Sequence, residues 1–450
     1  MRRFLITLAD TDNYAPDDTI NVGVPNAPFY QPLSDPSPGT ALSAKDWPQN
    51  EKLPLLFQPI QVGPMELKNR ILVAPMCQYS CAAEGEDAGC LTPWHLVHLG
   101  SFAVRGASVV MVEATSVLPN GRLSPQDSGL WNDRQRDALK PVFDFIKAQG
   151  AKAAIQIGHG GRKTSTLAPW LDTSTIKAPL KSHIATNGAA SGWTDNVMGP
   201  STIPYEEGTF PTPREMTEKD FEELKQAWVD ATRRADEAGA DILEIHSAHG
   251  YLLHNFLSPL SNVRTDKYGG SLENRLRYPL EVIANVRKQW PTNKPLFLRI
   301  SASDWYPKGE KNEKGEWASW GIEQSKIFVK EAIKLGVDLV DISSAGNTPE
   351  QKITTGPGYQ VPFAEQIRQS LTEEERKKTK ISSVGLITSG KQAEEILQKG
   401  QSDVVAIARE FLRDADTVFN WAQELGIVVN VPVQYQRAYT RMMTKPEDKK

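Results

Sequence analysis

Short apolar runs alternate with amphipathic helical stretches along most of this chain, and this alternation constrains the fold more than any other feature. The runs are residues 70–76, 108–113, 152–157, 242–246, 296–301, 338–344, 381–385 and 403–409. Runs of this kind are typical of buried parallel strands. Helical stretches end in glycine shortly before a run at Gly106, Gly150, Gly239, Gly336 and Gly400. The pattern predicts an α/β fold, a (β/α)8 TIM barrel in a single domain with an N-terminal extension.

A chain of 450 residues is long enough for one such barrel with extensions. Residues 1–52, rich in Pro, Asp, Asn and Ser, form an extension that we expect either to wrap the body or to be partly disordered. Residues 53–430 form the barrel, and residues 431–450 form a C-terminal tail. A doubly wound open sheet is the alternative fold, disfavoured because no Gly-x-Gly-x-x-Gly turn follows an early strand.

Charge and cysteine content narrow the cellular context. The net charge of −4 favours neither nucleic acid nor an anionic membrane surface as a partner. No apolar run approaches the roughly 20 residues that span a bilayer. The three cysteines, Cys77, Cys81 and Cys90, are clustered and odd in number, which argues against a disulfide framework. We therefore expect a cytoplasmic protein without membrane or nucleic-acid partners.

Chemically active side chains gather where the predicted strands end, the position at which barrel enzymes carry their sites. The run 242–246 ends in His246, and His249 and Tyr251 follow at once. Hydrolytic signatures are missing from the strand ends: there is no second carboxylate paired across the mouth, no Gly-x-Ser-x-Gly and no His-Glu-x-x-His. The sequence therefore predicts a site that works with imidazoles and phenols.

A phosphate site is predicted on the last two strands. Gly385 and Arg409 end the seventh and eighth runs, where barrels commonly bind a phosphate. A backbone N–H beside a small residue, together with a guanidinium, suits a phosphate dianion. Gln156 and Arg299, inside the third and fifth runs, could face a planar ring that becomes anionic. A phosphorylated heteroaromatic cofactor fits this set better than a bare metabolite.

Simpler interpretations exist for several of these residues. His246 and His249 could form a metal pair or a packed polar cluster. Cys77, Cys81, Cys90, His95 and His98 could be zinc ligands, although their spacing matches no ordinary finger. Free cysteines are often buried as small apolar residues, and we expect this for Cys81 and Cys90. Arg299 could belong to a structural ion pair, since a strand-interior arginine needs an anionic partner.

The strand-end motifs together resemble the old yellow enzymes, the FMN-dependent ene-reductases, and most closely the class of short bacterial NADPH dehydrogenases. Two of the motifs are Ala74-Pro-Met-Cys77 and His246-Ser-Ala-His249-Gly-Tyr251. The resemblance extends over residues 69–79, 112–116, 155–163, 244–252, 256–262, 264–271, 298–304, 383–387 and 407–414. It implies a (β/α)8 barrel that binds FMN.

The resemblance also implies roles for individual residues. The flavin ring would be lined by Ala74, Pro75, Met76, Cys77, Ala114 and Gln156. Arg299 would face the N1 and C2-carbonyl side of the ring, and Gly385, Ala408 and Arg409 would hold the phosphate. On the substrate side, His246 and His249 would bind a carbonyl or nitro oxygen, Tyr251 would donate a proton, and Tyr79 would add a further phenol. No metal site is implied.

The activity implied by the resemblance is reduction of an activated alkene. NADPH or NADH would reduce FMN, which would pass hydride to Cβ of an α,β-unsaturated carbonyl or nitro compound while Tyr251 protonates Cα. We also expect a homo-oligomer, because residues 432–437 resemble a tail whose arginine, here Arg437, reaches a neighbouring subunit's site. The chain departs from the family pattern at Ala408, where glycine is usual, and at Ala438-Tyr439 after that arginine.

Two other functions stay open from the sequence. One is a metal-dependent barrel hydrolase or lyase that uses His246, His249 and His95. The other is a flavin-binding protein without turnover, whose long loops serve partners.

Overall fold

The computed structural model describes residues 21–171, 182–188 and 190–439. Within this part of the chain, eight parallel strands close into a barrel, as the sequence predicts. In barrel order these are β3 (Ile71–Val73), β4 (Val109–Ser116), β5 (Lys152–Gly158), β8 (Ile242–Ser247), β9 (Leu296–Ser301), β10 (Leu339–Ser343), β11 (Lys380–Ser383) and β12 (Val404–Ile407). Strand β12 pairs with β3 and closes the ring.

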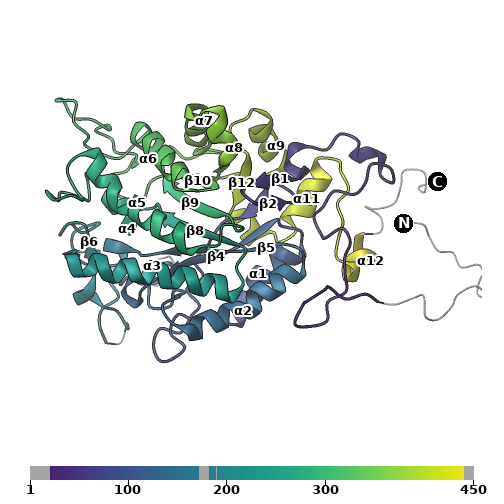
Figure 1. Cartoon of the computed structure of the whole chain (residues 1–450), viewed down its shortest axis with the longest axis horizontal. Helices are drawn as coiled ribbons and strands as arrows, with labels where there is room; N and C mark the ends of the chain where they lie inside the picture. Colours follow the sequence, from purple (N-terminus) through teal and green to yellow (C-terminus); the bar gives the residue numbers. More distant parts are fainter. Residues whose placement is uncertain (1–20, 172–181, 189, 440–450) are drawn as a thin grey trace, which may run out of the picture.

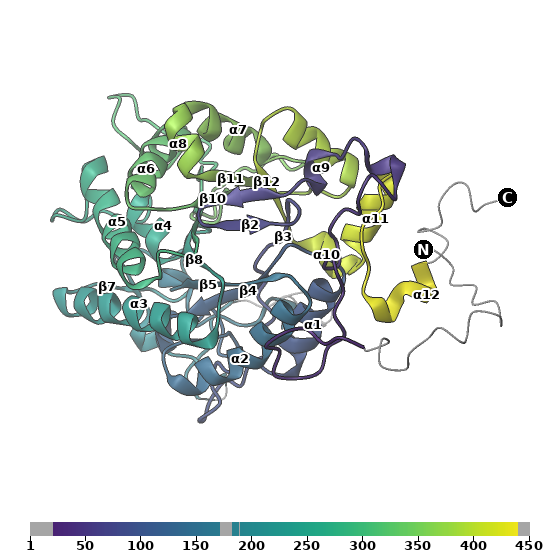
Figure 2. The ribbon, with the colours of Figure 1, turned by 45° about the vertical axis from the view of Figure 1, so that its right-hand side comes forward.

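Helices surround the barrel on its outside (Figure 2). The larger ones are α1 (Pro93–Val104), α2 (Asp133–Ala148), α3 (Glu218–Ala238), α5 (Leu272–Gln289), α6 (Ile322–Lys334), α7 (Val361–Ser370), α9 (Gly390–Gln398) and α11 (Thr417–Glu424). The glycines that end helical stretches in the sequence lie within two residues of the last residues of α1, α2, α3, α6 and α9. The sequence pattern missed the short helices α4 (Leu252–Leu257), α8 (Glu373–Lys378), α10 (Arg409–Arg413) and α12 (Gln436–Tyr439). Such short segments carry too few turns for a clear hydrophobic period.

Helix α3 shows how local sequence sets an element's bounds. The Thr217 hydroxyl accepts a hydrogen bond from the Asp220 N–H, and the Asp220 carboxylate accepts one from the Thr217 N–H, which completes a capping box. The helix ends at Gly239, whose φ of 95° is a left-handed conformation that favours glycine. The buried face between these ends includes Phe221 and Trp228.

The core lies in two layers, and the inner layer closes one end of the barrel. Inward-facing residues near the strand starts, among them Leu72 and Val109, pack against Val62 and Leu67. The latter two belong to a hairpin of β1 (Ile60–Val62) and β2 (Met65–Leu67). Each is fully buried, which stabilises the fold by about 1.5–3 kcal/mol per side chain. With this end filled, the carboxyl ends of the strands are left for a site.

The described part of the N-terminal extension packs against the body. Leu42 donates a backbone hydrogen bond to Val428, and the Gly39 N–H donates one to Asn430. The buried Asn50 side chain donates to the carbonyl oxygens of Leu42 and Val428. Residues 21–52 are therefore joined to the segment that follows α11, whereas residues 1–20 lie outside the described residues.

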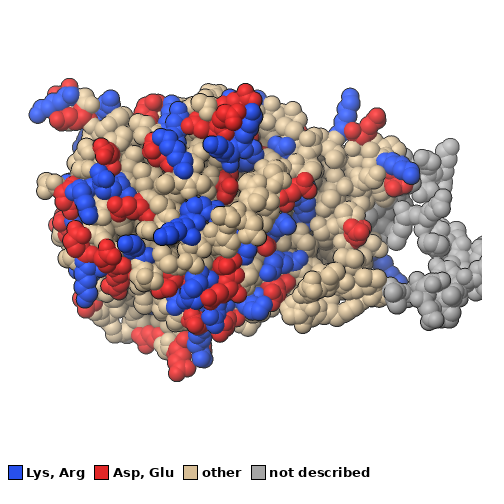
Figure 3. All heavy atoms as spheres, in the orientation of Figure 1, with Lys and Arg blue, Asp and Glu red and all other residues tan. Residues whose placement is uncertain are grey.

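The surface carries both charge signs. On the face seen in Figure 3, acidic and basic side chains are interspersed without a patch of one sign. Among the described residues, no helix combines the length and the apolar character that a membrane crossing requires.

Candidate active site

His246 lies at the carboxyl end of β8 and is only 4% exposed. Its Nδ1 accepts a hydrogen bond of 3.2 Å from the backbone N–H of Ala248. A neutral imidazole that accepts at Nδ1 carries its proton on Nε2. The local chain therefore presents His246 as a hydrogen-bond donor.

His249 and Tyr251 stand beside this imidazole, as the sequence predicts. The His246 ring centroid lies 5.1 Å from that of His249 and 4.9 Å from that of Tyr251, and both pairs are nearly perpendicular. His249 has a left-handed backbone, with φ of 59°, and its N–H donates to the Ser301 hydroxyl. Its Nε2 lies 2.7 Å from Ser343 Oγ, so β10 holds this second ring.

The surroundings keep the two imidazoles neutral and the phenol protonated. Burial and the nearby Arg299 charge lower the pKa of His246 and of His249 well below the usual range. Burial raises the pKa of Tyr251, and the neighbouring Cys77 and Asp127 raise it further. The group can therefore donate a hydrogen bond through His246 and hold a transferable proton on the phenol.

Arg299 forms the base of the site. It pairs with His246 in the register between β8 and β9, and its Nε lies 3.1 Å from Asp341 Oδ2 on β10. The sequence interpretation gave Arg299 an anionic ring as partner, whereas the structure gives its charge a carboxylate partner within the protein.

A second carboxylate of the base, Glu244 on β8, accepts a hydrogen bond of 2.7 Å from the Gln156 amide on β5. Burial, together with the charge of Asp341, raises the Glu244 pKa to about 8. The sequence interpretation missed both Glu244 and Asp341. The available signal was an acidic residue flanked by apolar residues, as in Leu243-Glu244-Ile245 and Val340-Asp341-Ile342.

Gly385, Ala408 and Arg409 line one cavity of about 180 Å³ together with Arg299. Gly385 and Arg409 lie just beyond β11 and β12 rather than inside them, and Arg409 is the first residue of α10. Gly385 has φ of 122°, and a Cβ there would stand 2.9 Å from Gln360 Nε2. Only glycine leaves this wall open.

Two further residues of this cavity, Tyr359 and Gln360, were missed from the sequence. Burial raises the Tyr359 pKa, while Arg409 and Arg299 lower it, so both guanidinium groups act on one phenol. The Gly356-Pro-Gly358 turn before α7 was the signal that could have drawn attention to them.

The segment from Ala74 to Tyr79 follows β3. The Ala74 N–H donates to Ile407 on β12, which carries the chain into the barrel mouth, and Pro75 and Met76 continue it. Burial and nearby carboxylates raise the Cys77 pKa well above its usual value, so the thiol stays protonated.

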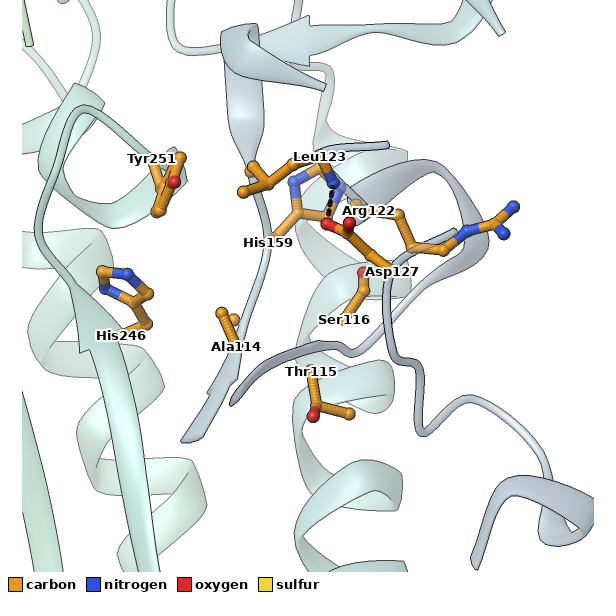
Figure 4. Close-up of a pocket in the computed structure, with 12 residues that line it drawn as sticks. Ala114, Thr115, Ser116, Arg122, Leu123, Asp127, His159, His246 and Tyr251 are labelled. Atoms are coloured by element: carbon orange, nitrogen blue, oxygen red, sulfur yellow. Dashed lines mark hydrogen bonds between the residues drawn. The ribbon is translucent and has the colours of Figure 1, made fainter. Parts of the chain in front are cut away.

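Tyr79 meets Tyr251 in an outer cavity of about 350 Å³ whose wall also includes Lys163, His183 and Phe210. The Tyr79 backbone is left-handed, with φ of 51°, and its ring packs edge-on against Trp170 at 5.4 Å. Ala114 lies on the other side, in a small cavity with His246 and Tyr251 (Figure 4). The structure therefore brings the predicted substrate-side residues around one mouth.

Four residues that the sequence singled out do not line this mouth, namely Arg437, His95, Cys81 and Cys90. Arg437 is exposed on α12, which in Figure 1 lies on the opposite side of the molecule from β6 (Met198–Gly199). The His95 Nδ1 accepts the Thr92 N–H, and its Nε2 lies 3.6 Å from Glu113. Cys81 and Cys90 are buried and free. Among the described residues, no group of three or more His, Cys, Asp or Glu side chains could hold a metal ion.

Comparisons with known proteins identify the family of this chain. Residues 55–426 match the NADH:flavin oxidoreductase / NADH oxidase family. The NADH:flavin oxidoreductase FG08077 of Gibberella zeae is 41% identical over 92% of this chain and 94% of its own length. The NADPH dehydrogenase of Bacillus subtilis is 41% identical over 85% of this chain and 99% of its own length.

Solved structures share the fold. Morphinone reductase superposes with a TM-score of 0.63 at 24% identity, over 84% of this chain and 91% of its own. The old yellow enzyme from Trypanosoma cruzi superposes with a TM-score of 0.64 at 20% identity, over 85% of this chain and 95% of its own.

Proposed function

Because this chain belongs to the NADH:flavin oxidoreductase / NADH oxidase family, we propose that it reduces activated alkenes, with α,β-unsaturated carbonyl or nitro compounds as its substrate class. It is an NAD(P)H-dependent oxidoreductase of the old yellow enzyme type, and FMN is its cofactor.

The residues present fit FMN. The cavity of about 180 Å³ is lined by the Arg409 guanidinium and by Gly385, which together suit a phosphate, and also by Arg299. Gly385, Ala408 and Arg409 would hold the phosphate. The ring would lie against Ala74, Pro75, Met76, Cys77, Ala114 and Gln156. Arg299 would place its positive charge beside the part of the ring that becomes anionic when reduced.

When bound, FMN takes up hydride from NADPH or NADH and supplies hydride to Cβ of the alkene. The protein contributes orientation and electrostatics around that transfer. His246 donates its Nε2–H to the substrate's carbonyl or nitro oxygen and stabilises the negative charge that develops there. Because the imidazole is neutral and fixed by Ala248, the donor is already in place before the charge forms.

His249, in the segment that follows β8, is the second residue of the pair that binds the oxygen. Its contact with Ser343 Oγ fixes the ring, and its position 5.1 Å from His246 allows both rings to flank one oxygen. Tyr251 then supplies the proton at Cα. Burial supports this role because the raised pKa keeps the phenol protonated until the substrate carbon becomes basic. Tyr79 lines the approach to the same face.

One observation carries the proposal: a neutral imidazole with a fixed Nε2–H stands 4.9 Å, ring to ring, from a protonated phenol at the barrel mouth. At this separation, one conjugated substrate can place its oxygen against the His246 donor and its Cα against the Tyr251 acid.

The test is purification with added FMN, followed by anaerobic mixing with NADPH and then with cyclohexenone, a maleimide or a nitroalkene. We expect a flavin spectrum that NADPH bleaches and the alkene restores, with formation of the saturated product. A protein that binds FMN and reacts with NADPH, but transfers hydride to none of these alkenes, would contradict the proposed substrate class.

A further inference from the structure

Behind the substrate-facing residues lies a third and smaller cavity, of about 20 Å³. Tyr251, His246 and Ala114 line it on the mouth side, and Ser116, Asp127 and His159 line it on the far side (Figure 4). A polar cavity larger than about 10–15 Å³ holds one water molecule if two to four polar groups can bind it. The volume suits one water, and His159 and Asp127 on the lining are polar groups that could bind it.

His159 provides a hydrogen-bond donor without an acceptor. It follows β5, is 3% exposed, and its Nδ1 accepts the Gly161 N–H at 3.0 Å. Burial lowers its pKa to about 3, so the ring is neutral and its proton resides on Nε2. Within the described residues, this buried Nε2–H has no hydrogen-bond partner. A buried donor left unpaired costs about 1–3 kcal/mol, and a water in the cavity would remove that cost.

Asp127 provides an acid on the far wall. Its carboxyl is 2% exposed and accepts hydrogen bonds from the Leu123 N–H and the Ser124 hydroxyl, both at 2.8 Å. Burial raises its pKa to about 7, although the Ser124 hydrogen bond lowers it. At neutral pH this carboxyl therefore exists in both protonation states.

The groups around Asp127 do not supply a strong counter-charge. Two ionic groups face it: Glu113 on β4 raises its pKa, and Arg122 belongs to the same loop. Arg122 points away from the cavity in Figure 4 and donates to the carbonyl oxygens of Pro119 and Pro125. The remaining titratable neighbours, besides His159, are the protonated side chains of Cys77, Tyr79, Cys81 and Tyr251.

We propose that this cavity holds one water molecule through which Asp127 returns a proton to Tyr251 after each turnover. The inference rests on the proposed function, in which Tyr251 gives its proton to the substrate carbon. The tyrosinate then takes a proton from the water, and the water takes one from the Asp127 carboxylic acid. The carboxylate regains its proton from solvent, so one proton enters for each proton delivered to the product. His159 holds the water in place through its Nε2–H.

The first test is structural and uses the wild-type FMN-loaded enzyme. A crystal structure should show an ordered water within about 2.7–3.2 Å of His159 Nε2 and within reach of Asp127. A dry cavity would overturn the proposal, whatever any variant does.

The second test follows multiple turnover of cyclohexenone against pH. In the wild type the relay needs the acid form of Asp127, so turnover should fall as pH rises through about 7. Asp127→Asn keeps the shape but removes the acid. It should turn over about tenfold more slowly below pH 7, and its rate should meet that of the wild type above it. Reduction of FMN by NADPH should stay within twofold of wild type.

Ser124→Ala is the matched control, because it loosens Asp127 without removing the acid. The Ser124 hydroxyl lowers the Asp127 pKa, so the fall in turnover should move to higher pH in this variant. A merely structural role of the loop would not move the profile in that direction. If Asp127→Asn keeps the wild-type profile, or Ser124→Ala leaves its midpoint unchanged, the relay is wrong.

Tyr251→Phe separates failure of the relay from failure of the proposed function. A slow Tyr251→Phe with an unaffected Asp127→Asn rejects only the relay. An unaffected Tyr251→Phe rejects the proton-donor role on which the relay rests.

Discussion

The backbone N–H of Ala248 donates a 3.2 Å hydrogen bond to Nδ1 of His246 and thereby leaves the imidazole proton on Nε2. His246 lies at the carboxyl end of β8 and Ala248 is the first residue after the strand, so the chain that carries the imidazole also sets its tautomer. His249 is held differently, by Ser343 from another strand. The two imidazoles are therefore not interchangeable, and substitutions should distinguish them.

Replacing His246 by alanine removes the fixed donor. We expect a loss of about 10²–10³ in the rate of alkene reduction, the effect of deleting one preorganised oxyanion donor. Reduction of FMN by NADPH should change much less, because it involves no substrate oxygen. Stopped-flow measurement of the two half-reactions checks this. His246→Asn restores a donor and should recover part of the loss. Equal effects of alanine and asparagine would contradict the donor role.

Replacing Tyr251 by phenylalanine removes the phenol proton and keeps the ring. Loss of a positioned general acid should slow oxidation of the reduced enzyme by an alkene about 10²–10⁴-fold. The matched control is Tyr79→Phe, because Tyr79 lines the same outer cavity and we assign it no proton transfer. Its effect should be confined to substrate affinity. If the two variants behave alike, Tyr251 is not the acid.

Gly385→Ala should weaken FMN binding by about tenfold or more, since an alanine at positive φ costs on the order of 1–3 kcal/mol. The φ of 122° is strained for alanine, and the new Cβ would stand 2.9 Å from Gln360 Nε2. The dissociation constant can be measured by flavin fluorescence quenching. Gly309→Ala is the control, with φ of 86° and no atom within 4 Å of the added Cβ. It should bind FMN as the wild type does, and an equal loss there would refute the explanation.

Asp341→Ala leaves the buried Arg299 charge without its carboxylate at 3.1 Å. Removing one partner of a buried pair costs about 3–5 kcal/mol. Urea unfolding of the flavin-free protein should show this loss. The control is Glu395→Ala, which breaks an exposed pair with Lys399 and should cost less than about 1 kcal/mol. Oxidised FMN should not supply the missing counter-charge, because its ring is neutral before it is reduced, so the difference in stability between Asp341→Ala and the wild type should persist when both are loaded with FMN.

The pH dependence of stability should report the neutral, buried His159. Its pKa falls from 6.5 to about 3 on folding, so between these values the unfolded chain binds a proton that the folded chain does not. The free energy of unfolding therefore falls as pH is lowered through this window, by up to about 1.4 kcal/mol per pH unit. His159→Gln should show a shallower fall in urea titrations. Above pH 7 both side chains are neutral. The difference in free energy of unfolding between His159→Gln and the wild type there measures the part of the cost that is unrelated to titration. An unchanged slope would show that His159 is charged in the folded protein.

Much of the architecture could be predicted from periodicity and glycine placement. The long helices and the central strands were located within a few residues, because each carries its own apolar pattern. The carboxyl ends of the strands were predicted less accurately than the strands themselves. Gly385 and Arg409 were assigned to strands but lie just beyond them, since the apolar pattern continues past the last ladder hydrogen bond.

The sequence by itself determined the order of the elements, the residues at the strand ends and, through the stretch from His246 to Tyr251, the imidazoles and the phenol at the barrel mouth. These features depend on neighbours within a few positions. The tertiary structure alone decided which distant residues complete one another. It placed Asp341 against Arg299 and brought Asp127, His159 and Tyr251 around one water-sized cavity. The physical reason is that burial and pairing depend on closure of the barrel, which joins residues that no local pattern relates.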